Sequence, residues 1–338
     1  MRNVSKVTEE DLKYAFDKIE YWYKKNIKFL TIVTVPFNTS CIFSNIICKL
    51  AQNNNKVLYV WGKNGENREL VNIVRELNSN ITHSYIEKGH SNSDFTFIHY
   101  SNLMKVKEHY DLVIFDDITY FSNLSNVTVR DMLEICASLG KRVLIYSIEK
   151  LALVGEKLEL VAYNYKKPFV EPRILTTRID LNLDIPFTLY DYFKWFRESN
   201  HKVVIYVPNR EKLSIVYDYF SNKLKLQDVK VIKVSEKDEM KRCEKVSKYK
   251  DKAIFVITNK IEELLEYCYM DDAVILFSDN ERYTYKKLLY VCGQIRNVNL
   301  KLPEVLLVSN EVSDDMERAK SMARDFNKKV WEKRLIEL

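Results

Sequence analysis

The amino-acid sequence predicts an α/β protein with two mostly parallel sheets, each flanked by helices. Short apolar runs of strand length alternate with segments of helical periodicity, which is the pattern of strand–helix–strand units. The alternation stops once, in a stretch that holds Pro168 and Pro172 and has little periodicity, and then restarts. A chain of 338 residues is long enough for two domains that each bury a core. We therefore predict domains at residues 1–165 and 187–338, joined by a link at residues 166–186.

The first domain is predicted from five apolar strands with helices between them. Thr8 precedes three acidic residues, a common start for a helix, and apolar residues then recur on one face as far as Tyr23. A short helix is expected near Leu103. Helical periodicity predicts the longer helices at residues 39–51, 68–78 and 127–139. The apolar runs predict strands at residues 29–35, 56–61, 95–99, 110–117 and 142–146.

The second domain is predicted from the same alternation. Apolar runs predict strands at residues 202–207, 229–234, 253–258, 273–277 and 305–308. Periodicity predicts helices at residues 190–198, 210–224 and 314–335. The last helix should bury one apolar stripe, which consists of Met316, Ala319, Ala323, Phe326 and Val330.

The composition is that of a globular protein and leaves its partners open. Hydrophobic residues make up 46% and charged residues 30%, and the net charge of +6 permits a polyanionic partner without requiring one. The histidines and cysteines lack ligand spacing, so we expect no metal site, and buried free thiols in a reducing compartment. No apolar run approaches the roughly 20 residues that span a bilayer, and early acidic residues exclude a secretory signal. We therefore expect a cytoplasmic protein without membrane insertion.

The clearest functional pattern is a short apolar run that ends in two acids, residues 110–117. Buried parallel strands place such acids at the carboxyl end of the sheet, where α/β proteins bind ligands. In nucleotide-driven motors the first acid, here Asp116, holds Mg²⁺, and the second, here Asp117, orients the attacking water. Acids also end buried strands without any further role, so the neighbouring motifs have to decide between the two interpretations.

Six short segments stand in a fixed order along the chain. In the first half they are Val-Thr-Val-Pro-Phe-Asn-Thr at 33–39, Asp-Asp-Ile-Thr-Tyr-Phe at 116–121 and Ser-Ile-Glu at 147–149. In the second half they are Tyr-Val-Pro at 206–208, Thr-Asn-Lys-Ile-Glu-Glu-Leu-Leu at 258–265 and Tyr-Val-Cys-Gly-Gln-Ile-Arg-Asn at 290–297. Their order and spacing resemble superfamily 2 helicases, and most closely the competence family ComFA, whose members are DNA translocases. The resemblance extends over nearly the whole chain, apart from the family's amino-terminal zinc module, and implies two tandem RecA-like domains.

The first of these segments departs from the pattern that the resemblance implies. In the family it is Gly-rich and closes with Lys-Thr, so that successive amides curl around the phosphates and the lysine neutralises them. Here Val35 and Phe37 replace glycines, Pro36 has no N–H to donate, and the neutral Asn38 replaces the lysine. The chain therefore lacks the cradle that holds a nucleotide.

The other phosphate-handling positions depart as well. Asp117 is one methylene shorter than the family's glutamate, and Gln294 and Asn297 stand where the resemblance places arginines. Loss of an arginine finger alone lowers the rate by about 10³–10⁵. We therefore expect no catalytic residues, and only a vestigial nucleotide site at Asn38, Thr39 and Asp116. Thr39 and Asp116 could still hold a metal, but the simpler interpretation is that Thr39 caps a helix and Asp116 ends a strand.

The sequence thus predicts a degenerate ComFA-like superfamily 2 helicase without ATPase activity, which needs no cofactor. It would act as a DNA-binding or scaffold component in DNA uptake or processing. Its predicted partners are single-stranded DNA, bound weakly and without sequence preference, and an active helicase paralogue or other DNA-uptake proteins. Two alternatives stay open. One is an active ATP- and Mg²⁺-dependent single-stranded DNA translocase with divergent motifs, and the other is a protein-interaction platform that does not bind DNA.

Overall fold

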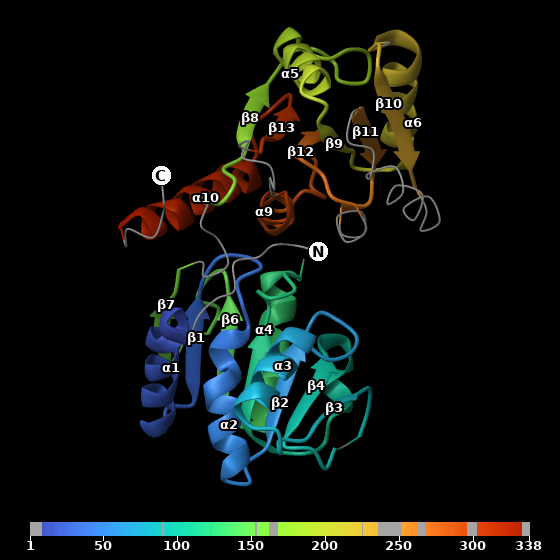
Figure 1. Ribbon diagram of the computed structural model, residues 1–338. Coiled ribbons are helices and arrows are strands. Elements are labelled where there is room, and N and C mark those ends of the chain that lie inside the picture. The colour runs from blue at the N-terminus through green and yellow to red at the C-terminus, as the bar shows by residue number, and fades with distance from the viewer. Residues whose placement is uncertain are drawn as a thin grey trace. The chain divides into compact units, whose positions relative to one another are not determined.

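The computed structural model describes residues 9–89, 91–122, 124–152, 154–161, 168–224, 226–235, 252–261, 268–295 and 303–332. The chain forms two compact units (Figure 1). Unit 1 comprises Met1–Lys167 with Lys329–Leu338, and unit 2 comprises Pro168–Lys328. Each unit has its own parallel sheet and its own core.

Unit 1 is built on a seven-stranded sheet in which all neighbouring strands are parallel, in the order β3-β4-β2-β5-β6-β1-β7. β5 lies in the middle, and its last residue, Asp116, is in register with Trp61 and Tyr146 on the neighbouring strands. The acid thus sits at the carboxyl edge of the sheet, as predicted. The strands are β1 (Phe29–Val33), β2 (Val57–Trp61), β3 (His83–Ile86), β4 (Phe95–His99), β5 (Tyr110–Asp116), β6 (Gly140–Ser147) and β7 (Glu156–Glu159).

Helices cover both faces of this sheet. α1 (Glu9–Lys24), α2 (Ser44–Gln52) and α3 (Arg68–Leu77) contact one another on one face. The 3₁₀ turn η1 (Cys41–Phe43) leads into α2, and the ring of Phe43 packs edge-on against Tyr59 and Tyr146. The other face is covered by α4 (Asn126–Leu139) and the 3₁₀ turn η2 (Tyr100–Lys105). They pack on residues of β2, β5 and β6 that alternate along each strand with the residues facing α1, α2 and α3.

Unit 2 is built on a six-stranded sheet, again entirely parallel, in the order β10-β11-β9-β12-β13-β8. The first strand of the unit, β8, is an edge strand that pairs with the last strand, β13. The strands are β8 (Arg173–Thr176), β9 (Lys202–Tyr206), β10 (Val229–Val234), β11 (Ala253–Thr258), β12 (Asp272–Leu276) and β13 (Val305–Ser309). Within the described residues, its helices are α5 (Phe187–Glu198), α6 (Arg210–Asp218), which continues into the π-helix η3 (Tyr219–Leu224), α9 (Tyr285–Gln294) and α10 (Asp314–Glu332), whose end from Lys329 on is assigned to unit 1.

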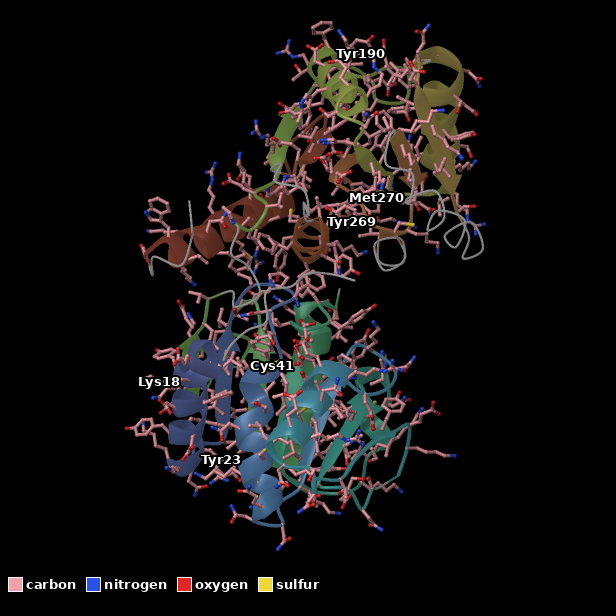
Figure 2. The ribbon with its side chains drawn as sticks, viewed as in Figure 1. Lys18, Tyr23, Cys41, Tyr190, Tyr269 and Met270 are labelled. Carbon is pink, nitrogen blue, oxygen red and sulfur yellow. The ribbon has the colours of Figure 1, made fainter. Side chains whose placement is uncertain are left out.

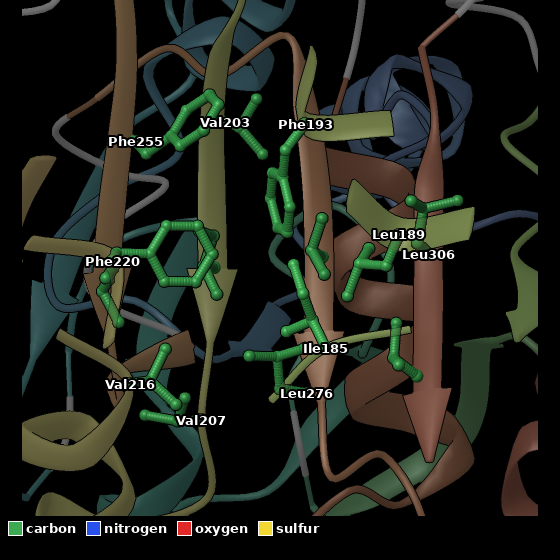
Figure 3. Packing of buried hydrophobic residues seen from close by; sticks show 14 of the residues in the cluster. Ile185, Leu189, Phe193, Val203, Val207, Val216, Phe220, Phe255, Leu276 and Leu306 are labelled. Carbon is green, nitrogen blue, oxygen red and sulfur yellow. The ribbon is translucent and has the colours of Figure 1, made fainter. Parts of the chain in front are cut away.

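One core of unit 2 lies between its sheet and the helices α5 and α6 (Figure 3). Phe193 of α5 is at its centre. The centroid of its ring lies 5.0 Å from the ring centroid of Phe220 and 5.3 Å from that of Phe255. Burial of each such side chain contributes about 1.5–3 kcal/mol to the free energy of unfolding. The apolar stripe predicted for the last helix is confirmed, because all five of its residues are buried on α10: Met316, Ala319, Ala323, Phe326 and Val330.

The predicted α/β fold class is confirmed, and several elements differ in detail. The helix predicted at 39–51 begins later, with η1 followed by α2, because Thr39 Oγ1 accepts the amide of Cys41 (3.1 Å) in a turn. Thr39 therefore does not cap an α-helix. The segment predicted as a link, residues 166–186, contributes β8 to the second sheet. β3 and β7, both edge strands of unit 1, were not predicted.

Two further features concern the thiols and the helices. The cysteines that the structure describes are buried free thiols, as predicted, and burial raises the pKa of the Cys41 thiol to about 12. Within the described parts of the chain, no helix combines the length and apolar character needed to cross a membrane.

Candidate functional site

The loop after β1, residues 34–40, is where the sequence predicts a vestigial nucleotide site. Two of the amides in this loop, those of Phe37 and Thr39, are bonded within unit 1. The amide of Phe37 donates to the carbonyl of Ile118 (2.8 Å), and the amide of Thr39 donates to Asn38 Oδ1 (2.9 Å). Phosphate loops bind anions through amides that are available to the ligand. These amides would have to break protein hydrogen bonds before they could do so.

The buried side chain of Asn38 holds this loop through hydrogen bonds within the protein. Its side chain is only 1% exposed, and Nδ2 donates both to Thr34 Oγ1 and to the carbonyl of Val161, each at 2.8 Å. Both hydrogens of the amide are thus used within the protein. The side chain that replaces the lysine is uncharged, buried and directed away from any phosphate.

Phe37 adopts a conformation that usually belongs to glycine. Its φ is +61°, in the left-handed region where a bulky side chain is strained. Its ring packs edge-on against Phe121, with 6.1 Å between the ring centroids. The tight turn is thus retained, but an aromatic side chain projects from it where a phosphate loop has none.

The carboxylate of Asp116 is held by three hydrogen bonds. Oδ1 accepts from the amides of Ile118 and Thr119, both at 2.8 Å, and Oδ2 accepts from the hydroxyl of Tyr59. The side chain is 2% exposed, and burial raises the pKa of Asp116 in spite of these bonds. Its oxygens therefore serve the turn after β5, and a metal ion would have to displace Tyr59 to reach Oδ2.

Asp117 also has a structural role, and the remaining predicted positions lie in unit 2. Asp117 Oδ1 accepts from both the amide and the hydroxyl of Ser122, which closes the turn after β5. Gln294 is the last residue of α9 and is half-buried. Asn297 lies outside the described residues. Unit 1 brings Asn38, Thr39 and Asp116 into one hydrogen-bonded region, since the amide of Phe37 reaches the carbonyl of Ile118.

Unit 2 has a cavity of about 210 Å³ at the carboxyl ends of its central strands. It is lined by the residues after β9 (Val207, Pro208), by those after β11 (Asn259, Lys260, Ile261), and by Arg282, Tyr283 and Lys287. We call it the unit 2 pocket. Among the described residues, its lining includes the cations Lys260, Arg282 and Lys287 and no acid, so it is suited to an anion.

The position of the unit 2 pocket follows from the order of the strands. After β9 the chain leads to β10, and after β11 it leads to β12, which lies on the other side of the β11–β9 pair. In open α/β sheets, the point where the strand order reverses is where ligands bind, outside the carboxyl ends of the strands. The loops after β9 and β11 meet at that point.

The pocket lining contains buried polar atoms that are not satisfied. Within the described chain, the hydroxyl of Tyr283 and the Oδ1 of Asn259 are buried without a hydrogen-bond partner. Tyr283 is 2% exposed, and burial raises the pKa of its hydroxyl well above the usual range, so it remains a donor at neutral pH. An unpaired buried hydroxyl destabilises a protein by about 1–3 kcal/mol. Both atoms lack accessible surface, so they lie behind the wall of the pocket and do not face its space.

Arg282 is held in place at the mouth of the pocket. One terminal nitrogen donates to the carbonyl of Pro208 (3.0 Å), and the Arg282 amide donates to Asn280 Oδ1 (3.1 Å). Its other guanidinium hydrogens remain available for a bidentate contact with an anion. α9 begins at Tyr285 beside the pocket, and its N-terminus adds a partial positive charge close to Lys287 in its first turn.

The sequence analysis missed part of this site. The segments at 206–208 and 258–265 belong to the quoted motifs, and both contribute to the lining. Arg282, Tyr283 and Lys287 were not singled out. The available signal was a run of polar and cationic residues directly after the buried strand β12, a position where α/β proteins place ligand-binding groups.

Comparisons with known proteins bear on the fold. No protein-family model and no curated protein sequence matches the chain. Among solved structures, the Escherichia coli DExH-box NTPase HrpB is 12% identical, with a TM-score of 0.53, and the match covers 94% of this chain and 43% of that chain. The DUF1998 helicase MrfA bound to DNA is 13% identical, with a TM-score of 0.48, and the match covers 94% of this chain and 48% of that chain.

The likeness to HrpB, at low identity, concerns the fold alone. The chain spans less than half the length of either helicase. Both sheets of this chain are parallel and flanked by helices, and the strand ends carry the loops described above. The chain therefore has a helicase-like fold, with two RecA-like α/β units in tandem.

Proposed function

We propose that this chain is an ATPase-inactive, helicase-like protein that binds single-stranded DNA without sequence preference. The observation that carries the proposal is the unit 2 pocket, whose described lining includes the cations Lys260, Arg282 and Lys287. As the resemblance to ComFA implies, the protein would act as a DNA-binding or scaffold component in DNA uptake or processing. An active helicase paralogue, or another DNA-uptake protein, would supply the ATP-driven step.

The absence of ATPase activity is proposed from the hydrogen bonds of unit 1. The amides of Phe37 and Thr39 are used within the protein, and Asn38 is buried in place of a cation. The Asp116 carboxylate accepts three protein hydrogen bonds. Phosphoryl transfer depends almost entirely on positioning and on charge stabilisation, and both would be missing here. ATP and Mg²⁺ would therefore not be needed.

Binding of DNA is proposed from the size and charge of the unit 2 pocket. A volume of about 210 Å³ is smaller than the roughly 300–1,000 Å³ typical of sites for whole small molecules. It suits a phosphate group better than a nucleotide. Contacts to phosphate position a nucleic acid but read no sequence, so the binding should not depend on base order.

Fluorescence anisotropy with a labelled single-stranded oligonucleotide tests the proposal. We expect binding that weakens steeply between low and physiological salt, because counterions are released when phosphates are neutralised. Mg-ATP should not change the affinity. ATP-dependent modulation of binding would favour an active translocase. If no binding occurs even at low salt, a protein-interaction platform is the better description.

A further inference from the structure

We propose that the buried pair His201–Asp272 makes unit 2 sensitive to pH, because the pair holds a proton between two central strands and loses it as the pH rises. His201 directly precedes β9, and Asp272 is the first residue of β12, which pairs with β9 in the sheet. The pair thus lies at the amino ends of these strands, at the opposite edge of the sheet from the unit 2 pocket. The inference concerns the stability of unit 2 and does not depend on binding of DNA.

Both side chains of the pair are withdrawn from water. The exposed fraction is 4% for His201 and 0% for Asp272. His201 Nδ1 lies 2.5 Å from Asp272 Oδ2, and Asp272 Oδ1 accepts the amide of Glu304 (2.8 Å). Because an ionised carboxylate can only accept hydrogen bonds, Nδ1 carries a hydrogen and donates it to Asp272. One proton is therefore held between the two side chains.

The charges beside Asp272 add to its own charge instead of offsetting it. The preceding residue, Asp271, is a second acid, and the carboxylate of Glu304 is paired with Arg173 (2.9 Å). A buried carboxylate is strongly disfavoured unless a positive charge compensates it. Burial therefore raises the pKa of Asp272, although the hydrogen bond from His201 lowers it. Burial also raises the pKa of Glu304, while Arg173 lowers it.

The contacts of His201 from other elements bring no further charge to its ring. α5 contributes the rings of Trp195 and Phe196, whose centroids lie 5.0 and 6.0 Å from that of the imidazole. β11 contributes the amide of Ile254, which donates to the carbonyl of His201 (3.1 Å). On β9 the next residue is the half-buried cation Lys202. The imidazole in direct contact with the carboxylate can compensate it, and it does so by taking up a proton.

The sign of the pH effect follows from the raised pKa of Asp272. The folded protein keeps a proton on the pair at a pH where the unfolded chain, in which aspartate ionises near pH 3.9, has released it. A folded state that binds more protons than the unfolded state is stabilised as the pH falls. The stability that the pair contributes is therefore present in acid and is lost as the pH rises through the folded-state value. Carboxylates in ordinary ion pairs act in the opposite direction.

Thermal unfolding of the full chain at pH 5.5 and at pH 8 tests the inference. Asp272→Asn keeps the shape of the side chain and removes its charge, and His201→Gln removes the imidazole. Acidification should raise the melting temperature of unit 2 by about 2–4 °C more in the native protein than in either variant. His83→Gln is the matched control in unit 1, because His83 also contacts a carboxylate, that of Glu66 (2.8 Å), but the Glu66 side chain is 31% exposed and water can solvate it. This control should respond to pH as the native protein does.

Trp195 gives a second readout at the pair itself. It lies on α5, the helix on which Figure 2 labels Tyr190, and it is the one tryptophan of unit 2. A change of charge on His201 should change the emission of this neighbouring ring. A fluorescence titration from pH 8 to pH 5 should show a transition that disappears in His201→Gln and in Trp195→Phe, and that persists in His83→Gln.

Either measurement can overturn the inference. An equal change of melting temperature with pH in the native protein and in Asp272→Asn would do so, as would a fluorescence transition that survives in His201→Gln. If His201→Gln does not fold, the comparison of the native protein with Asp272→Asn decides, by both readouts. None of these results bears on the proposed binding of DNA, which fails only if no oligonucleotide binds at low salt.

Discussion

In unit 1, the amides of Phe37 and Thr39 and the side chain of Asn38, all in the loop after β1, form hydrogen bonds within the protein. In unit 2, the loops after β9 and β11 and the residues around Arg282 surround a cavity whose described lining carries cations. Both units place these groups at the carboxyl ends of parallel strands. The difference lies in charge, because the loop in unit 1 carries the neutral Asn38 whereas the described lining of the unit 2 pocket carries cations. A fold supplies the position of a site, and its chemistry depends on the side chains placed there.

The largest effect should come from removing the cations of the unit 2 pocket. The double substitution Arg282→Gln with Lys287→Gln should weaken binding of single-stranded DNA about 100-fold, and lower the slope of log affinity against log salt by about 1–2. Lys63→Gln is the matched control in unit 1, because Lys63 is exposed and follows β2 at the same edge of its sheet. It should change the affinity less than about twofold. A similar loss of affinity for single-stranded DNA in Lys63→Gln would show that the binding does not depend on the unit 2 pocket in particular.

Removal of a hydroxyl should destabilise unit 1. Tyr59→Phe leaves Asp116 Oδ2 buried without its donor, so we expect the free energy of unfolding to fall by about 1–3 kcal/mol. Urea unfolding followed by tryptophan fluorescence measures the change, with Trp61 close by as a reporter, since 6.2 Å separates the two ring centroids. A neutral result would mean that Tyr59 does not hold the carboxylate as described.

The same change should have the opposite sign in unit 2. Tyr283→Phe removes a buried hydroxyl that has no partner among the described residues, so we expect a gain of about 1 kcal/mol in the free energy of unfolding. Thermal and urea unfolding of the two variants, measured side by side, give the comparison directly. If Tyr283→Phe destabilises the protein, the hydroxyl has a structural role.

The smallest expected effect is that of nucleotide on unit 1. Millimolar Mg-ATP should leave the melting temperature unchanged, because a ligand stabilises only a state that binds it. A ligand that does bind the native state, at a concentration 100 times its dissociation constant, would raise the free energy of unfolding by about 2.7 kcal/mol. The same measurement on Asp116→Ala is the control. An upward shift of the melting temperature in the native protein that is lost in Asp116→Ala would show a working nucleotide site, and would contradict the proposed lack of nucleotide binding in unit 1.

The strands that could be predicted from the sequence are those whose apolar runs are buried on both faces. Phe95–His99 and Ala253–Thr258 were predicted with the bounds that the structure has, and so was the edge strand Val229–Val234, because it is rich in valine and isoleucine. The edge strands β7 and β8 were missed because one side of them faces solvent and their composition is polar, with Glu-Lys-Leu-Glu in β7 and Arg-Ile-Leu-Thr in β8. Periodicity carries no signal for such short, half-buried strands.

The candidate site could be predicted only in part. The sequence showed that Asn38 replaces a cation, but not that Thr34 and Val161 take up its two hydrogens, since Val161 is distant in the chain. It also gave no sign that Tyr283 and Asn259 meet in one pocket. Such contacts depend on the order of the strands in the sheet, which local composition does not determine.

The pairing of β8 with β13 has a consequence for synthesis of the protein. β8 is the first strand of unit 2 to leave the ribosome, and Arg173 pairs with Leu306, more than a hundred residues later. Until β13 has emerged, β8 has no neighbour to bond with, and its backbone stays open to chaperones and proteases. A chain that stops before Val305 would lose β8 as well as β13, so one truncation would strip two strands from the same edge of the sheet.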